Sequence, residues 1–329
     1  MDLVTFNVIV DDIVYPDGHT CMACLGGGGP QTAFGAKIWA DDANNIGIAS
    51  RVGSDFPFPC KRWLQDMGID LSGLLMWSSP TLRAWQILEL DGSRTQVWRI
   101  TMGDEVLDML RLPLSSLPMM YRNARVYHIG VHPSGRDVGF IKELRSTGAE
   151  IVSVETYTHA LDIVTRSELI ELVSSGNIFS SNEKEAASLV GPGSPMEMIE
   201  RITELGAEVV TLRRGPFGSI VHRSDTRETW EIPAFHAICA SQSPSLQGEN
   251  TVGKVVDPTG CGNTFCGAFA MGWWKTRDLL TSGLWGSVAA SFMAEYEGVP
   301  PPQLSDWRKQ AQMRLDMLRP YAKNLFLPM

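Results

Sequence analysis

The sequence is poor in the features that mark a secreted or a membrane-spanning protein. Six cysteines in 329 residues are too few for a disulfide scaffold and are typical of a reduced, cytoplasmic protein. No apolar run reaches the roughly 18–20 residues that a membrane span needs. The N-terminal segment MDLVTFNVIVDD has no basic region and runs into acids. It therefore predicts a first strand and not a signal peptide.

Basic side chains are also scarce. The chain has 28 Lys and Arg against 37 Asp and Glu, a formal net charge of -9 at pH 7 and a pI of about 5.2. So acidic a surface repels phosphate backbones and anionic lipid, so we expect neither nucleic acid nor a membrane as partner. A small phosphorylated molecule stays compatible with this charge, because a turn and a helix terminus can bind it locally.

Apolar segments of strand length alternate with segments of helical period, and 44% of the residues are hydrophobic. The predicted strands are Val4–Val10, Ile46–Val52, Arg125–Val131, Glu150–Glu155, Glu208–Leu212 and Ser219–His222. The predicted helices are Thr32–Ala40, Lys61–Met67, Val138–Ser146, Met196–Leu205, Thr264–Lys275, Leu284–Glu295 and Ser305–Leu318. This alternation predicts one α/β domain over residues 1–329, a mostly parallel sheet with helices on both faces.

Two segments depart from the alternation. Thr81–Glu89 and Ser93–Ile100 flank Asp91 and Gly92, a hairpin turn signal, so residues 81–100 predict a β-hairpin. The hairpin is either a lid over a site or an ordinary edge hairpin. Residues Cys239–Asn250 have the composition of a flexible loop, which we expect to lead into a strand at Val252–Val256.

The most informative motif is a glycine-rich turn at Asp257–Asn263, which precedes a segment of helical period. Gly260 and Gly262 let backbone N–H groups approach an anion, and the helix N-terminus adds its partial positive charge. The turn therefore predicts an anion site suited to phosphoryl transfer. The alternative is an ordinary strand-to-helix turn in which Asn263 is the N-cap.

The turn resembles the C-terminal signature D-T-x-G-A-G-D of the pfkB (ribokinase-like) carbohydrate kinases. The corresponding residues are Asp257, Thr259, Gly260, Cys261, Gly262 and Asn263. Further elements that resemble the family, in the right order, are the glycine run 26–33, Val52–Asp55, Asn182–Glu185 and Thr211–Ser219. The resemblance covers nearly the whole chain. Its D-P-T-G-x-G-N form is most similar to that of the fungal maintenance-of-killer-like branch.

The resemblance implies a ribokinase-like three-layer sandwich with a small β-hairpin lid, which in family members often forms a homodimer contact. It implies ATP and Mg²⁺ as cofactors and a small-molecule substrate. On the nucleotide side it implies roles for Asn182, Glu185, Thr211, Arg213, Gly218, Asp257 and Thr259, with Glu185 serving the metal. On the acceptor side it implies roles for Asp11, Gly27, Gly28 and Thr32.

The chain departs from the family at the base. The last Asp of the signature accepts the proton of the sugar hydroxyl, and here Asn263 occupies its place. A neutral amide is no base, and loss of general-base catalysis typically costs ~10²–10⁴-fold in rate. The cradle of backbone amides survives the change. Two hypotheses follow: a slow ATP- and Mg²⁺-dependent phosphotransferase acting on a sugar, nucleoside or small polyol, or a pseudokinase or repurposed enzyme of another reaction class.

Four further residues have more than one interpretation. Glu155 and His159 lie at the end of a predicted strand, where active sites gather. They are candidates for substrate contact or for a replacement base, and each is also consistent with a structural role. Arg213 either binds a phosphate or pairs with an acidic neighbour. Cys261 begins a helix, which would lower the pKa of its thiol, although we interpret it as a small space-filling residue.

Overall fold

The structure is a computed structural model, and it describes residues 1–41, 45–90, 94–99, 111–241 and 254–325. Its centre is a ten-stranded sheet. Seven neighbouring strands of this sheet run parallel to one another, and the three strands at the other end are each antiparallel to the strand before them. In sheet order the strands are β14 (Lys323–Asn324), β13 (Glu228–Ile232), β12 (Ser219–Arg223), β11 (Val209–Arg213), β10 (Ile178–Asn182), β9 (Ile151–Thr156), β8 (Val126–Val131), β1 (Leu3–Phe6), β4 (Ile46–Val52) and β5 (Leu74–Met76). The predicted mostly parallel sheet is confirmed.

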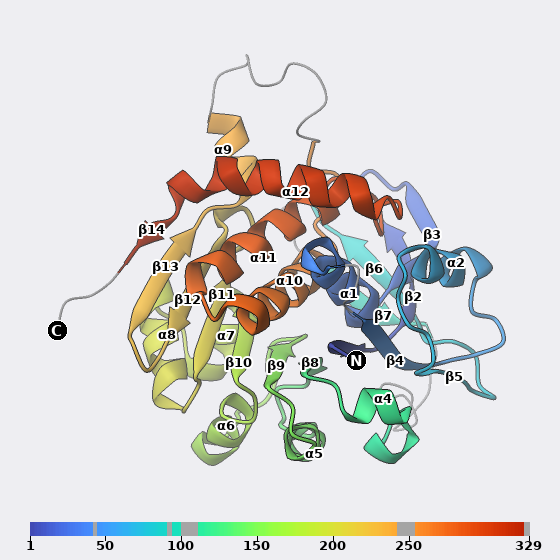
Figure 1. The fold of residues 1–329 in the computed structure, drawn as a ribbon, viewed down its shortest axis with the longest axis horizontal. Helices are drawn as coiled ribbons and strands as arrows, with labels where there is room; N and C mark the ends of the chain where they lie inside the picture. The colour runs from blue at the N-terminus through green and yellow to red at the C-terminus, as the bar shows by residue number, and fades with distance from the viewer. Residues whose placement is uncertain (42–44, 91–93, 100–110, 242–253, 326–329) are drawn as a thin grey trace.

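Helices cover both faces of this sheet (Figure 1). One face carries α1 (Gly28–Trp39), α2 (Phe58–Asp66), α10 (Cys261–Thr276) and α11 (Leu279–Met293), with α9 (Phe235–Ser241) and α12 (Leu304–Leu318) packed outside. The other face carries α4 (Met119–Arg122), α5 (Val138–Ser146), α6 (Arg166–Val173), α7 (Glu183–Val190) and α8 (Pro195–Glu204). Among the described residues, no helix combines the length and the apolar character of a membrane span.

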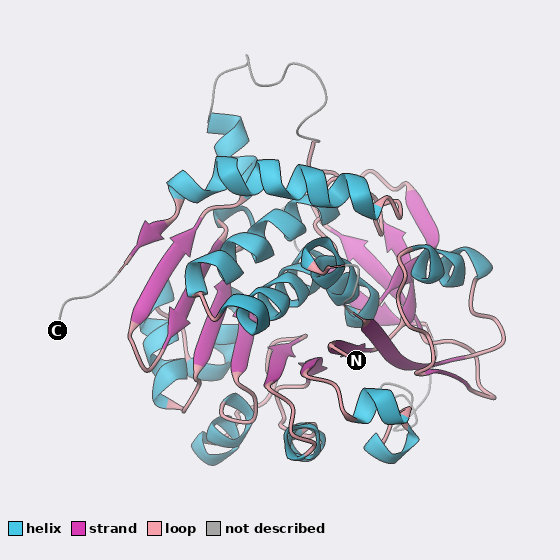
Figure 2. Cartoon of the chain, viewed as in Figure 1, coloured by secondary structure: helices cyan, strands magenta, loops and turns pink. Residues whose placement is uncertain are grey.

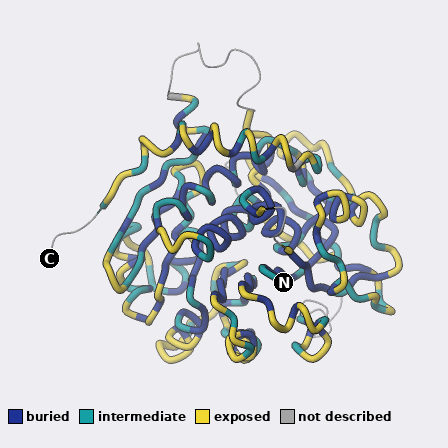
Figure 3. The backbone as a smooth tube through the Cα atoms, viewed as in Figure 1, coloured by how far each residue is buried: buried dark blue, intermediate teal, exposed yellow. Residues whose placement is uncertain are grey.

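Two apolar cores lie on the two faces of the sheet. Successive residues of a strand point to opposite faces, so neighbouring residues belong to different cores. Leu3 and Ile151 belong to the core under α1 and α10, whereas their neighbours Val4 and Val152 belong to the core under α5 to α8. Both faces are therefore apolar, which explains why the parallel strands read as near-continuous hydrophobic runs. Figure 3 shows the same arrangement as a band of buried backbone through the centre of the molecule.

The predicted hairpin is part of a second, four-stranded sheet with the order β3-β2-β6-β7, which we call the lid sheet. Its strands are β2 (Ile9–Val14), β3 (Thr20–Gly26), β6 (Arg83–Leu88) and β7 (Arg94–Trp98), and Figure 2 shows them to one side of the central sheet. β6 and β7 are antiparallel as predicted. The turn at residues 91–93 lies outside the described residues.

The predicted first strand, Val4–Val10, is wrong as a single element. Asn7 adopts φ +72° and splits it into β1 of the central sheet and β2 of the lid sheet. Asparagine tolerates this left-handed conformation better than other residues with a side chain. The break turns the Asn7 carbonyl toward α1, where it accepts a hydrogen bond of 2.9 Å from the amide of Gly29.

The prediction around the 239–250 loop is also wrong in part. Cys239–Ser241 form the end of α9, and residues 242–253 lie outside the described residues. Residues 254–256 form no strand. The amides of Val256 and Asp257 instead donate to the carbonyl of Ala294, which follows α11. The described segment that leads into the glycine-rich turn is therefore hydrogen-bonded to the C-terminal end of α11 and is not part of a strand.

Helices α1 and α10 pack unusually closely, because each has a glycine at their contact. A Cβ added to Gly35 would lie 2.0 Å from the carbonyl oxygen of Thr264. A Cβ added to Gly267 would lie 1.9 Å from the carbonyl oxygen of Thr32. Both distances are far inside van der Waals contact, so only glycine fits at these positions, and this contact places the first turns of the two helices side by side.

We expect Gly267→Ala to destabilise the protein by about 1–3 kcal/mol, because the new methyl group forces the two backbones apart. Gly139→Ala is the matched control, since Gly139 is exposed on α5 and nothing lies within 4 Å of an added Cβ. The control should be neutral or more stable by up to about 1 kcal/mol, from helix propensity alone. Chemical denaturation measures both changes, and equal effects would contradict the close contact.

Candidate active site

A pocket of about 210 Å³ lies at the carboxyl ends of the parallel strands, beside the first turn of α10. Its walls are the turn from Pro258 to Asn263, the ends of β9, β10 and β11, and the lid-sheet residues Leu88 and Arg94. Ligands bind in open α/β sheets at this edge. Two residues of the predicted hairpin therefore contribute to the pocket wall.

The glycine-rich turn starts α10 at the wall of this pocket. Asp257 is fully buried, and its Oδ1 accepts a hydrogen bond of 2.8 Å from the amide of Thr259, which holds the turn. Gly260 has φ +84°, a conformation that favours glycine, and it is the N-cap of α10. The alternative in which Asn263 is the N-cap is therefore wrong. The amides of Gly262 and Asn263 belong to the first helical turn, where N–H groups have no carbonyl partner within the helix.

Two buried polar atoms of the pocket wall have no hydrogen-bond partner among the described residues. They are Oγ1 of Thr259 and Nε of Arg213. Thr259 is only 5% exposed, so bulk water does not satisfy its hydroxyl. Because buried polar groups are nearly always paired in native proteins, these two atoms indicate that a ligand or ordered water completes the pocket.

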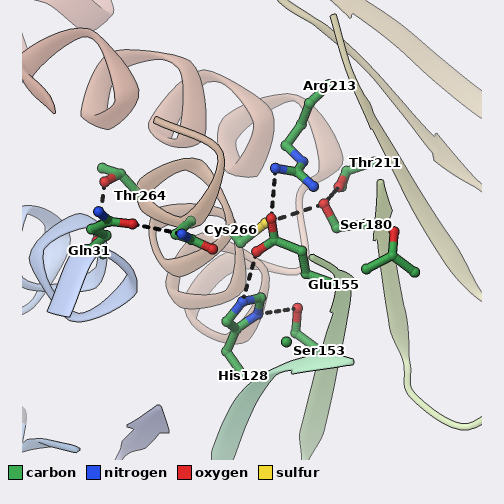
Figure 4. A network of polar contacts seen from close by, with 12 residues as sticks. Gln31, His128, Ser153, Glu155, Ser180, Thr211, Arg213, Thr264 and Cys266 are labelled. Atoms are coloured by element: carbon green, nitrogen blue, oxygen red, sulfur yellow. Dashed lines mark hydrogen bonds and ion pairs between the residues drawn. The ribbon is translucent and has the colours of Figure 1, made fainter. Parts of the chain in front are cut away.

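Asn263 is held from α1. Its Nδ2 donates to Oε1 of Gln31 over 2.7 Å, and a Cβ on Gly28 would lie 3.5 Å from its Oδ1. Figure 4 shows Gln31 next to Thr264, whose hydroxyl donates to the Gln31 carbonyl over 3.2 Å. Gln31 was missed as a site residue, although it lies in the glycine run that resembles the family. Its side chain fixes the amide that replaces the base.

A buried ionic network forms the floor of the pocket (Figure 4). Nη1 of Arg213 lies 2.7 Å from Oε1 of Glu155 and Nη2 lies 3.3 Å from Oε2 of Glu185. The second oxygen of Glu155 lies 3.3 Å from Nε2 of His128. Of the two interpretations of Arg213, the structure shows the pairing with acidic neighbours.

The pairing decides the protonation of Glu155. Burial by itself would raise the pKa of this carboxyl, but the charge of Arg213 and the hydrogen bond with His128 lower the pKa to about 2. Burial raises the pKa of Glu185, and the adjacent charge of Glu155 acts in the same direction, while Arg213 opposes both. Glu155 is thus a poor proton acceptor near neutral pH.

The network residues share one face of the sheet because they alternate with apolar residues. Four strands each place a polar residue two positions after an apolar residue of the core under α1 and α10. These polar residues are His128 on β8, Ser153 on β9, Ser180 on β10 and Thr211 on β11. Thr211 donates to Ser180 over 2.7 Å, and Ser180 lies 3.2 Å from Sγ of Cys266. His128, Ser180 and Cys266 were missed. For His128 and Ser180 a sequence signal was available: each is a polar residue two positions after a buried apolar one, near the end of a strand.

Neither metal arrangement at this network fits a bound ion well. His128, Glu155 and Cys266 have potential ligand atoms within 4.8 Å of one another, but the guanidinium of Arg213 lies directly on Glu155 and opposes a further cation. A predicted Mg²⁺ ligand, Glu185, is already occupied. Its oxygens accept from the amide of Asn182 at 2.8 Å, the Nδ2 of Asn182 at 2.7 Å and the hydroxyl of Thr156 at 3.3 Å. Its carboxylate does not fit the role of a metal ligand.

Several predicted residues lie away from the pocket wall. Asp11 is buried in the lid sheet, where it accepts from Nε2 of Gln86 over 2.7 Å. Thr32 is buried against α10, and His159 is exposed in the loop after β9. Gly218, with φ +88°, forms the turn before β12 and packs on the carbonyl of Ile232.

Two more of the predicted residues serve the turns themselves. Gly27, with φ +90°, is the N-cap of α1 and packs on the carbonyl of Asn7. At Cys261 the expected direction of the pKa is wrong. Burial raises the pKa of this thiol to about 12, and the nearby Asp257 carboxylate adds to the shift, so the helix terminus does not prevail. Cys261 is an inert thiol, in keeping with a space-filling role.

Comparisons with known proteins agree with this geometry. Residues 25–306 match the model of the pfkB family carbohydrate kinases. The chain is 26% identical over 283 residues to the cytidine kinase of Thermococcus kodakarensis, covering 85% of this chain and 91% of that protein. It is 25% identical over 310 residues to protein MAK32 of Saccharomyces cerevisiae, covering 84% and 78%. The second match is consistent with the fungal branch that the sequence indicates.

Solved structures of similar fold include two ribokinase-family enzymes. The nucleoside kinase of Methanocaldococcus jannaschii superposes with a TM-score of 0.67 at 22% identity, over 96% of this chain and 99% of that chain. The Arabidopsis thaliana ribokinase, solved with ribose and ATP, superposes with a TM-score of 0.64 at 19% identity over the same shares. The fold is ribokinase-like, and the chain belongs to the pfkB family of carbohydrate kinases.

Proposed function

We propose that this protein is an ATP-dependent phosphotransferase of the pfkB type with atypical, slow catalysis, acting on a hydroxyl of a sugar, a nucleoside or another small polyol. The observation that carries the proposal is the first turn of α10, whose free amides and buried, unpartnered Thr259 hydroxyl meet in one pocket. Relatives described as cytidine kinase and nucleoside kinase support a nucleoside or sugar acceptor.

In this proposal the chain works mainly by position and by backbone dipoles. The amides of Gly262 and Asn263 stabilise negative charge that develops on the transferring phosphoryl group. The side chain of Asn263, held by Gln31, hydrogen-bonds the acceptor hydroxyl but cannot remove its proton. The nucleotide lies along the turn and the ends of β10 and β11, where Asn182, Thr211 and Arg213 are found. The acceptor lies toward the lid sheet.

The lack of an available base among the described residues of the pocket wall favours a second candidate, a pseudokinase that binds nucleotide without turnover or a pfkB fold reused for another reaction. The carboxylates of the described pocket wall are Glu155 and Glu185, and Arg213 pairs with both. Asp257 is engaged by the amide of Thr259 and by the hydroxyl of Tyr15, at 3.3 Å. His159, the other predicted alternative, is exposed outside the pocket.

A homodimer through the lid sheet and a cytoplasmic location remain predictions. The lid-sheet edge strand β7 is exposed along all five of its residues, including Val97 and Trp98, which supports the dimer. A second subunit would protect this edge, which pairs with no other described strand, from other strands.

We expect Asn263→Asp to raise phosphotransfer by tenfold or more, because the carboxylate restores general-base catalysis worth ~10²–10⁴-fold. Gln31 accommodates the change by rotating its amide, so that Nε2 donates to the new carboxylate. The measurement is ATP consumption over a panel of sugars and nucleosides, after ATP binding has been established by thermal shift. Asn263→Ala is the matched control and should show no gain. ATP binding without a gain in Asn263→Asp would favour the pseudokinase.

The acceptor side contains a carboxyl group with an unusual titration. Burial raises the pKa of Asp11 from 3.8 to about 6; the hydrogen bond from Gln86 and the charge of Arg94 lower it, and Asp12 and Asp257 add to the increase. A carboxyl whose pKa rises on folding holds its proton more tightly in the folded state. Ionised Asp11 therefore reduces stability as pH rises from 3.8 toward 6, and the loss is complete above that value.

We expect Asp11→Asn to stabilise the protein at pH 7.5, by on the order of 2 kcal/mol, with a smaller gain at pH 5. Asp12→Asn is the control of opposite sign. Asp12 is buried and pairs with Arg83 at 2.9 Å and with Arg99, and these contacts lower its pKa. Its substitution should destabilise at pH 7.5. Denaturation at the two pH values measures both, and an Asp11→Asn effect that does not change with pH would contradict the raised pKa.

A further inference from the structure

Arg213 lies where the ionic floor of the pocket meets the first turn of α10. It is the last residue of β11, and its side chain is 11% exposed. A Cβ added to Gly262 would lie 2.0 Å from its Nη1, so the guanidinium lies directly against the backbone of that turn. One fixed positive charge thus contacts both the carboxylates and the predicted anion cradle.

The pocket needs a positive charge of this kind if it binds a polyphosphate. Its described wall contains two buried carboxylates, Glu155 and Glu185, which would repel phosphate groups. The basic side chains of that wall are Arg94 and Arg213, and Arg94 is exposed on β7. Arg213 is therefore the buried basic residue of the described wall that offsets the negative charge of both carboxylates.

The two carboxylates of the described pocket wall are already engaged and therefore fit a divalent cation poorly. Glu185 accepts from the backbone and side chain of Asn182 and from Thr156, in addition to Arg213. Glu155 accepts from Arg213 on one oxygen and faces His128 with the other. A cation bound to either carboxylate would also lie beside the guanidinium, which repels it.

Arg213 retains donors for a ligand after these pairs are made. A guanidinium has five N–H donors in a planar fork. One nitrogen of Arg213 faces Glu155, a second faces Glu185, and Nε has no partner among the described residues. The free donors and the unpartnered hydroxyl of Thr259 belong to the same pocket wall. A phosphate oxygen is a suitable acceptor for a guanidinium or a hydroxyl donor.

We propose that the guanidinium of Arg213 takes the place of a divalent metal in this pocket, so that the protein binds the phosphates of a nucleotide without Mg²⁺. The inference rests on the proposed function, because it assumes that a nucleotide occupies the pocket. It differs from the cofactor set that the family resemblance implies. Arg213 is in this view a binding residue that supplies fixed charge to the anion cradle.

Isothermal titration of the full chain with ATP, once in EDTA and once with Mg²⁺, tests the proposal on the unaltered protein. We expect the two dissociation constants to agree within about threefold. Binding that requires Mg²⁺ would overturn the role of Arg213 and leave the proposed function intact. The absence of ATP binding under both conditions would overturn the proposed function and this inference with it.

Arg213→Met should weaken ATP binding in EDTA by tenfold or more, and Mg²⁺ should restore part of the loss, because Glu155 and Glu185 are released as ligands. Arg214→Met is the matched control. Arg214 pairs with Glu183 at 2.9 Å and with Glu231 at 3.0 Å and is not part of the pocket wall. The ATP affinity of the Arg214→Met variant should equal that of the unaltered protein. Tighter ATP binding in Arg213→Met would show that the guanidinium blocks the cradle, which contradicts the proposal.

Discussion

The contact between α1 and α10 is the constraint on which the pocket depends. Gly35 and Gly267 bring the two helix backbones into direct contact, and no side chain fits between them. The first turns of both helices consequently meet at the carboxyl edge of the sheet. There Gln31 of α1 holds Asn263 of α10, and Gly262 and Asn263 of the first turn of α10 line the pocket. The positions of the amides follow from helix packing more than from the turn itself.

A buried ionic network faces these amides across the pocket. Placing Glu155, Glu185 and Arg213 together below the surface carries a large desolvation cost, and well-packed apolar residues would serve stability equally well or better. Buried charged groups of this kind are often found at functional sites, where their charge contributes to binding or catalysis. In this chain the network shares a pocket wall with the first turn of α10, and two of its residues, Glu185 and Arg213, belong to segments that resemble the family motifs. The replacement of the base by Asn263 and the presence of Arg213 change the charge of one and the same pocket.

The fold was largely predictable because buried positions recur in the sequence with the period of a helix or a strand. The seven predicted helices all exist, with ends shifted by a few residues, and the parallel strands form long apolar runs. Prediction failed where one residue redirected the chain. Asn7 divides an apolar run between two sheets through a single backbone angle, and β10 was missed because Ser180, Ser181 and Asn182 interrupt its apolar pattern. The site was predicted from motifs, yet Cys266 on α10 carries no local signal, because it meets Ser180 only after the strands and α10 have packed.

The sequence by itself determined the α/β class, the glycine-rich turn at Asp257–Asn263 and the presence of Asn263 where the family signature has Asp, since each depends on local periodicity or on the identity of one residue. Only the tertiary structure decided the state of the charges. The pairing of Arg213 with Glu155 and Glu185 joins three strand and helix ends that are far apart in the chain. Burial raises the pKa of Cys261, where its place at the helix terminus alone predicts the opposite. The reason is that desolvation and charge pairing depend on distances in space, which residue order does not contain.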